Sequence, residues 1–375
     1  MATTNRHGPA GSSQRSHHVI DALAVALQIG QPVLLWGGPG EGKSALVESV
    51  AEQLGRPCEV VVGSVREASD FAGLPMRVDD SVTFAPPRWA TRCLQAPHTV
   101  VFLDELTTAS PSVQAAMLRV VLEREVGDLR LPSTVSFVAA ANPPELSAGG
   151  DDLSAPLANR FCHLEWESDV AAWSVGMLRG WVPRAAPIVP AARSAFEDRW
   201  RATVVAFVTA RPAVLRQVPS DIVGQGKAWA SPRTWDRAHR VAAAADAAGA
   251  SPEALRLLIA GLVGQGPAIE LLRFADAMDL PLPDALLADP GLLPTDARVD
   301  LLLAALAGVA TAVAGDPTPE RWSAAWDVLA VACDAGRADV AAMAAVSLAE
   351  LRHDDWPAPG SAAAFAPLLR AAELV

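Results

Sequence analysis

The sequence predicts an α/β domain on a five-stranded parallel sheet, followed by two helical regions. Between residues 19 and 168, short apolar segments alternate with helical patterns, which is typical of a parallel sheet covered by helices. A glycine-rich loop joins the first apolar segment to the first helical one, and strand patterns disappear after Asp169. The expected strands are Val33–Trp36, Cys58–Val62, Val100–Leu103, Val135–Ala139 and Cys162–Trp166.

Two further strand pairs interrupt the alternation. Apolar residues alternate with polar ones on both sides of Asp79-Asp80, which predicts a β-hairpin near 76–84. A second hairpin is expected near 125–130. The expected domains are a disordered tail over 1–18, the α/β core over 19–168, a helical lid over 169–245 and a C-terminal helical region over 246–375, a candidate adaptor for a partner.

Composition limits the class of protein. The 375 residues carry a net charge of −12, and no basic run is present, which weighs against a free-standing nucleic-acid binder. The four cysteines are widely spaced, as expected in the reducing cytoplasm. The first 18 residues lack the apolar segment of a signal peptide. The longest apolar run, Leu301 to Gly315, is shorter than the roughly 20 residues that span a membrane, so we expect a buried helix.

Residues 37–44 form a complete G-x-x-x-x-G-K-[ST] loop between a strand and a helix. This arrangement directs backbone N–H groups and a helix N-terminus at phosphate oxygens. We expect Lys43 to reach the β- and γ-phosphates of ATP, and the Ser44 hydroxyl to bind Mg²⁺. The predicted nucleotide-binding residues of the loop are Gly37, Gly38, Pro39, Gly40, Glu41, Gly42, Lys43 and Ser44.

Polar residues follow two other strands at the same edge of the sheet. The third strand ends in Asp104 and Glu105, and the fourth in Asn142. Asp104 is expected to hold Mg²⁺ partly through water, while Glu105 orients and deprotonates the attacking water. Asn142 is placed to bond both the γ-phosphate and the water; the alternative is a simple Asn-Pro turn.

These motifs resemble an AAA+ ATPase, and within it the MoxR group of the helix-2-insert clade. The resemblance rests on GGPGEGKS, FLDEL, QAAMLRVVLEREV, AAANPPE and LSAPLANRF, in that order within residues 31–166. It implies that Asn142 is sensor 1 and that Arg160 is an arginine finger donated to a neighbouring subunit. Arg233, at a helix start, matches sensor 2, in its own subunit or the next. Asn159 departs from the usual Asp before the finger.

The resemblance also implies assembly and partners. It suggests a homo-oligomeric ring, a hexamer. Arg124 either faces a neighbour in that ring or does not; Phe71 and the Asp79-Asp80 tip either line its pore or are simply a packed side chain and a solvated turn. It implies a chaperone-like remodeller driven by Mg-ATP hydrolysis, with a protein partner of the von Willebrand factor A domain type. Two alternatives stay open: a motor directed at nucleic acid, and a nucleotide-dependent scaffold with little turnover.

Overall fold

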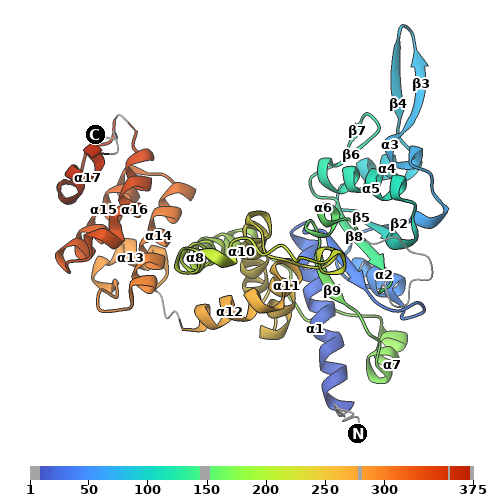
Figure 1. Cartoon of the computed structure of the whole chain (residues 1–375), viewed down its shortest axis with the longest axis horizontal. Coiled ribbons are helices and arrows are strands. Elements are labelled where there is room, and N and C mark those ends of the chain that lie inside the picture. Colours follow the sequence, from blue (N-terminus) through green and yellow to red (C-terminus); the bar gives the residue numbers. More distant parts are fainter. Residues whose placement is uncertain (1–8, 144–152, 278–280, 354, 372–375) are drawn as a thin grey trace. The chain divides into compact units, whose positions relative to one another are not determined.

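The computed structural model describes residues 9–143, 153–277, 281–353 and 355–371 (Figure 1). The chain divides into two compact units. The first comprises residues 1–190 and 216–268, and the second residues 191–215 and 269–375. The expected lid, 169–245, is therefore shared between them: its residues 191–215 belong to the second unit and the rest to the first.

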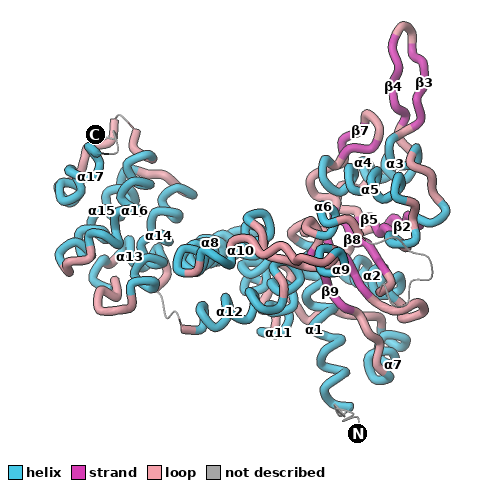
Figure 2. Tube along the Cα trace, viewed as in Figure 1, coloured by secondary structure: helices cyan, strands magenta, loops and turns pink. Residues whose placement is uncertain are grey.

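The first unit is built on a five-stranded parallel sheet, as predicted (Figure 2). The strands are β1 (Val33–Trp36), β2 (Cys58–Val62), β5 (Val100–Asp104), β8 (Ser136–Ala141) and β9 (Cys162–Glu165). Their order is β2-β5-β8-β1-β9. The first three residues of β1, the first four of β5 and all of β8 are buried, because helices cover a parallel sheet on both faces. This order brings the carboxyl ends of β1, β5 and β8 together.

The first unit also contains ten helices among its described residues, of which α1, α2 and α11 pack against the sheet. They are α1 (Pro9–Gln28), α2 (Lys43–Gln53), α3 (Ser69–Ala72), α4 (Arg88–Gln95), α5 (Pro111–Glu123), α6 (Ala155–Ala158), α7 (Val170–Arg179), α9 (Ile222–Gln225), α10 (Pro232–Ala247) and α11 (Pro252–Val263). Helix α2 contacts β2, β5 and β8, whereas α1 and α11 contact β9. At Gly261 in α11, an added Cβ would lie 2.5 Å from the His163 carbonyl oxygen, so only glycine permits this close approach.

The N-terminal helix corrects one expectation. Residues 1–8 lie outside the described residues, but the chain is helical from Pro9, so the disorder expected over 9–18 was wrong. Contacts with distant segments anchor this part of the helix. The Ser16 hydroxyl donates to Asp169 Oδ2 at 2.8 Å, and His18 Nδ1 lies 2.7 Å from the Ser251 hydroxyl. These partners are more than 150 residues away in the sequence, so the polar composition of the segment does not predict the contacts.

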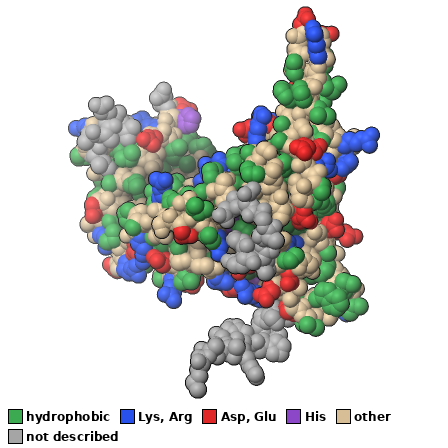
Figure 3. Space-filling view, turned by 45° about the vertical axis from the view of Figure 1, so that its right-hand side comes forward, with side chains coloured by type: hydrophobic (Ala, Val, Ile, Leu, Met, Phe, Trp, Pro, Cys, Tyr) green, Lys and Arg blue, Asp and Glu red, His purple; other side chains and the backbone are tan. Residues whose placement is uncertain are grey.

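Both predicted hairpins are present. The first pairs β3 (Leu74–Val78) with β4 (Ser81–Ala85), and the second pairs β6 (Glu125–Val126) with β7 (Leu129–Arg130). Asp128 joins the two, because its carboxylate accepts from the Phe84 N–H at 2.8 Å and its own N–H donates to the Phe84 carbonyl at 3.1 Å. Figure 3 shows the first hairpin projecting from the surface, with hydrophobic side chains along its length.

The second unit is helical. It contains most of α8 (Pro190–Ala210) and α12 (Gln265–Asp276), and all of α13 (Pro283–Ala288), α14 (Val299–Gly315), α15 (Pro319–Asp334), α16 (Ala338–Glu350) and α17 (Ala366–Ala371). Its core gathers Trp322, Trp326 and Trp356, and the Trp322 indole N–H donates to the Leu348 carbonyl at 2.7 Å. The apolar run at 301–315 is the largely buried helix α14, as predicted. Among the described helices, none is both long and apolar enough to span a bilayer.

Candidate nucleotide site

A cavity of about 340 Å³ opens where β1, β5 and β8 end. Helix α2 begins at Lys43, and both Gly40 and Gly42 have a φ of +79°, a conformation that glycine adopts without strain. The sheet thus brings the loop together with the polar ends of two other strands, as the sequence predicts. The cavity is lined by Pro39, Gly40, Glu41, Gly42, Lys43, Ser44, Asp104, Glu105, Ala140, Ala141 and Asn142.

The Lys43 ammonium uses all three donors on protein oxygens. It donates to the carbonyls of Gly37 at 2.6 Å and Gly38 at 2.9 Å, and to Asn142 Oδ1 at 2.9 Å. Burial lowers the pKa of Lys43, and Asp104 and Glu41 oppose this by stabilising the charged form. A phosphate bound in the cavity would therefore lie beside the Lys43 ammonium, which is hydrogen-bonded to the predicted sensor, Asn142.

Ser44 and Asp104 form the second pair of the site. The Ser44 hydroxyl donates to Asp104 Oδ2 at 3.0 Å. This oxygen set suits Mg²⁺, which takes one or two protein carboxylates and completes its shell with phosphates and waters. Among the described residues, no group of three or more His, Cys, Asp and Glu side chains is arranged to hold a metal ion.

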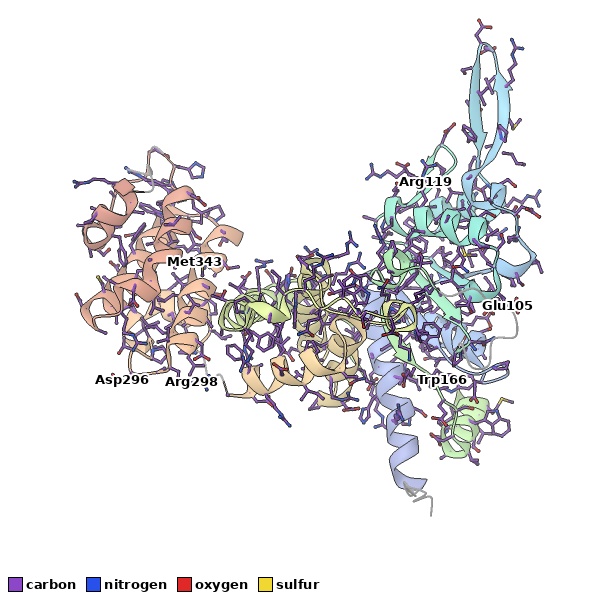
Figure 4. All side chains as sticks on the ribbon, in the orientation of Figure 1. Glu105, Arg119, Trp166, Asp296, Arg298 and Met343 are labelled. Atoms are coloured by element: carbon purple, nitrogen blue, oxygen red, sulfur yellow. The ribbon has the colours of Figure 1, made fainter. Side chains whose placement is uncertain are left out.

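Glu105 has a partner that sequence reasoning missed. The Ser64 hydroxyl donates a hydrogen bond to its Oε2. Ser64 follows β2, and Val62 of β2 is in register with Asp104 of β5, so the two strand ends lie side by side. Glu105 itself has a φ of 56°, unusual for a residue with a side chain, and is exposed at the cavity (Figure 4). The only available signal was a polar residue just after a strand.

Residues that follow β9 form hydrogen bonds with the phosphate loop at Glu41. The Trp166 indole, labelled in Figure 4, donates to the Glu41 carbonyl at 2.8 Å. The Glu41 carboxylate accepts from the Ser168 N–H at 2.9 Å and from its hydroxyl, and these bonds lower the pKa of Glu41. Glu41 is therefore held by the loop that follows β9 and leads to α7.

The two predicted arginines do not line the cavity. Arg160 follows α6, where its Nη1 donates to the Pro156 carbonyl, and Arg233 is the exposed second residue of α10. The buried Asn159 joins these segments, because its Nδ2 donates to the Trp229 carbonyl at 3.1 Å and its Oδ1 accepts from the Ser231 hydroxyl at 2.8 Å. The structure thus brings both arginines together at a place separate from the cavity of the same chain.

The structure decides between the alternatives that the sequence left open for Arg124 and Phe71. Arg124 does not face outward: its Nη1 donates to the carbonyls of Pro132 at 3.2 Å and Val135 at 2.6 Å, and its guanidinium lies over the Phe137 ring. Phe71 is 1% exposed and packs against Trp89, so it belongs to the core rather than to a pore. Arg124 is thus partly buried and Phe71 fully buried.

The five-stranded parallel sheet with its covering helices is consistent with an AAA+ fold. Residues 32–161 match the family model described as AAA domain (dynein-related subfamily). The chain is similar to the transcriptional regulatory protein ZraR of Salmonella typhimurium, at 28% identity over 163 residues, 40% of this chain and 36% of that protein. It is also similar to midasin of Giardia intestinalis, at 28% identity over 153 residues, 38% of this chain and 3% of midasin.

A solved structure provisionally described as an ATPase from Cytophaga hutchinsonii aligns with a TM-score of 0.42 at 17% identity, covering 68% of this chain and 88% of that one. The chain spans about a third of ZraR and a small part of midasin, so the match concerns the AAA domain alone. At that level the comparisons agree with the family expected from the motifs.

Proposed function

We propose that this protein is an Mg-ATP-hydrolysing AAA+ motor that acts in the cytoplasm as a chaperone-like remodeller of a partner protein. One observation carries the proposal: Lys43, the Ser44–Asp104 pair and Glu105 surround a single cavity behind a glycine loop. A scaffold that only binds nucleotide has no need of a carboxylate placed to activate water.

The proposed reaction is an in-line attack of water on the γ-phosphorus. The new bond forms between water oxygen and phosphorus, the bond to the bridging oxygen of ADP breaks, and the water proton passes to the Glu105 carboxylate. Mg²⁺ held by Ser44 and Asp104 would neutralise charge that develops on the phosphates. Lys43 exchanges an oxygen partner for a phosphate oxygen, which frees Asn142 to bond the γ-phosphate and the water.

Arginine from a neighbour completes the proposed site. Neither Arg160 nor Arg233 lines the cavity of its own chain. An arginine supplied in trans stabilises charge in the transition state and is typically worth about 10³–10⁵ in rate. We therefore propose a ring, a hexamer, in which Arg160 reaches the nucleotide of the next subunit and Arg233 reads phosphate in its own subunit or the next.

The β3–β4 hairpin favours a protein as the partner. Its apolar side chains Leu74, Met76, Val78, Val82 and Phe84 are 42–62% exposed, and its tip carries Asp79 and Asp80. Exposed apolar patches mark protein interaction sites, whereas phosphate contacts require basic groups. Residues 246–375 are the proposed adaptor region, and a von Willebrand factor A domain is the partner class that we propose. A nucleic-acid motor remains the second candidate.

The test is affinity capture with Glu105→Gln in the presence of ATP. This variant keeps the phosphate contacts but lacks the base, so it should hold ATP and its partner together. Capture should be lost in Glu105→Gln combined with Lys43→Ala, and in Glu105→Gln combined with Met76→Ser and Val82→Ser on the hairpin. Recovery of nucleic acid instead of protein would support the second candidate. ATP turnover that is unchanged in Glu105→Gln would overturn the assignment of the base.

A further inference from the structure

Three arginines converge where α6 meets α10. Arg160 follows α6, and Arg233 and Arg237 lie four residues apart in α10, so their side chains share one face of that helix. The Arg237 Nη1 donates a hydrogen bond to the backbone carbonyl of Arg160. Sequence reasoning singled out Arg160 and Arg233; only the tertiary fold reveals Arg237.

Within the described part of the chain, none of the three arginines forms an ion pair, although the nearby Asp236 carboxylate partly offsets the charge of Arg237. Arg240, two turns beyond Arg233 in the same helix, differs because it forms an ion pair with Asp236 at 3.2 Å. The Nε of Arg160 is buried without a hydrogen-bond partner. Burial, then Arg233 and Arg160, lower the pKa of Arg237 to about 10. Arg160 is likewise shifted downward in pKa by burial and by Arg233.

Like charges that are partly buried without a counter-ion destabilise the fold that holds them. The fold nevertheless fixes them together. Asn159, next to Arg160, is held by Ser231 and by the Trp229 carbonyl. Ser231 is also the N-cap of α10, in a capping box with Thr234. The segment carrying Arg160 is thus clamped to the helix that carries the other two arginines, a geometry that suits an anion with several oxygens.

We propose that Arg237 is a positioning residue that holds Arg160 against α10, and that Arg160, Arg233 and Arg237 together form a polyphosphate site. This inference rests on the proposed ATPase function. The phosphates could belong to the nucleotide of a second copy of the chain or to a free polyphosphate. The chemistry is the same in both cases, and the cluster's separation from its own cavity favours the second copy.

The first experiment compares ATP turnover of the assembled full-length chain with that of Arg237→Gln. We expect kcat to fall on the order of 100-fold, as for a misplaced catalytic group, with the KM for ATP little changed. Arg237→Lys, which retains a charge and a donor, should recover part of the loss. Arg240→Gln, exposed on the same helix, is the matched control and should retain the wild-type rate. An unchanged kcat in Arg237→Gln, or an equal loss in Arg240→Gln, would overturn the proposal.

The second experiment separates this role from a merely structural one. In a Lys43→Ala background, which disables the nucleotide cavity, inorganic tripolyphosphate should raise the Tm, and adding Arg237→Gln should abolish the rise. Without ligand, Arg237→Gln should change the Tm little, because the lost hydrogen bond to the Arg160 carbonyl is offset by relief of the repulsion from Arg160 and Arg233. A lower Tm together with an unchanged response to tripolyphosphate would contradict the proposal and indicate a structural arginine.

The third experiment identifies the source of the phosphates. Lys43→Ala subunits keep all three arginines, and Arg237→Gln subunits keep an intact cavity. If the cluster acts on the nucleotide of a second copy, mixing the two should restore turnover; no recovery in mixed assemblies would overturn that assignment. If wild type itself fails to hydrolyse ATP, the proposed function fails. If wild type hydrolyses ATP and Arg237→Gln equals it, only this inference fails.

Discussion

The Ser64 hydroxyl donates a hydrogen bond to Oε2 of Glu105, the proposed base, and so takes up one of the acceptor positions of its carboxylate. The two residues follow neighbouring strands, β2 and β5, and face each other at the open edge of the sheet. A hydrogen bond to a charged group contributes about 1.5–3 kcal/mol. Ser64 therefore restrains Glu105 while no phosphate is present.

The first prediction concerns this restraint. Ser64→Ala should raise the basal rate of ATP hydrolysis by about tenfold, the kinetic equivalent of losing one such bond. Steady-state turnover in the absence of any partner measures it. Ser81→Ala, on the exposed hairpin, controls for loss of a hydroxyl and should leave the rate unchanged. A fall in turnover in Ser64→Ala would mean that Ser64 holds Glu105 in its productive position.

The second prediction concerns pH and the buried His163 in β9. Its Nδ1 accepts from the Trp36 indole at 2.9 Å, and its Nε2 lies 2.9 Å from the Ala158 carbonyl. Burial, aided slightly by Lys227, lowers the pKa of His163 from 6.5 to about 4. Below pH 6.5, His163 is therefore protonated in the unfolded chain but stays neutral in the folded chain. The free energy of unfolding consequently falls as the pH drops from 6.5 towards 4. The loss amounts to about 3 kcal/mol.

Urea unfolding of wild type and His163→Gln at about pH 7.5 and about pH 5 tests this, because histidine changes charge in that window. Glutamine can donate and accept at similar positions but does not titrate. Wild type should lose more stability than His163→Gln over this range. The exposed His98, changed to Gln, should leave the pH dependence of wild type intact. If the free energy of unfolding fell equally with pH in wild type and in His163→Gln, His163 would not be the group that causes the pH dependence.

The third prediction concerns the start of the phosphate loop. An added Cβ at Gly37 would lie 2.7 Å from the Trp166 carbonyl oxygen and 3.3 Å from Lys43 Cδ. Gly37→Ala should therefore displace the loop, cost about 1–3 kcal/mol of stability and weaken nucleotide binding. Thermal unfolding and the Kd for a fluorescent ATP analogue measure the two effects. The control is Gly266→Ala in α12, where no atom lies within 4 Å and alanine should stabilise the helix by about 0.5–1 kcal/mol.

Features of the fold and site that depend on local sequence patterns were predictable. The sheet and the loop at 37–44 were predictable, because apolar strands, glycines and the residues that follow them are local patterns. The order β2-β5-β8-β1-β9 then brings Asp104 and Asn142 to Lys43 as a consequence of parallel topology. Two hairpins were found in the same way, from alternation around a turn.

Residues whose role depends on distant contacts were not predictable. Arg237 carries no local signal and Ser64 only that of a polar residue after a strand, since each acquires its partner only when separate segments meet. The same reason explains why the sequence left the role of Arg124 open: its guanidinium donates to carbonyls that lie beyond a hairpin. The helix from Pro9 and the division of the expected lid between two units likewise depend on tertiary packing.

The fourth prediction tests whether one site requires two copies of the chain. Arg160→Ala subunits keep Lys43, and Lys43→Ala subunits keep Arg160, so each variant should hydrolyse ATP poorly alone. In an equal mixture, about a quarter of the head-to-tail interfaces would combine an intact cavity with an intact arginine, and turnover should recover to that extent. A mixture of Lys43→Ala with Glu105→Gln contains no intact cavity and should stay inactive. If gel filtration shows that Arg160→Ala and Lys43→Ala co-assemble without recovery, Arg160 does not act across the interface, and the open side of the cavity must receive another group.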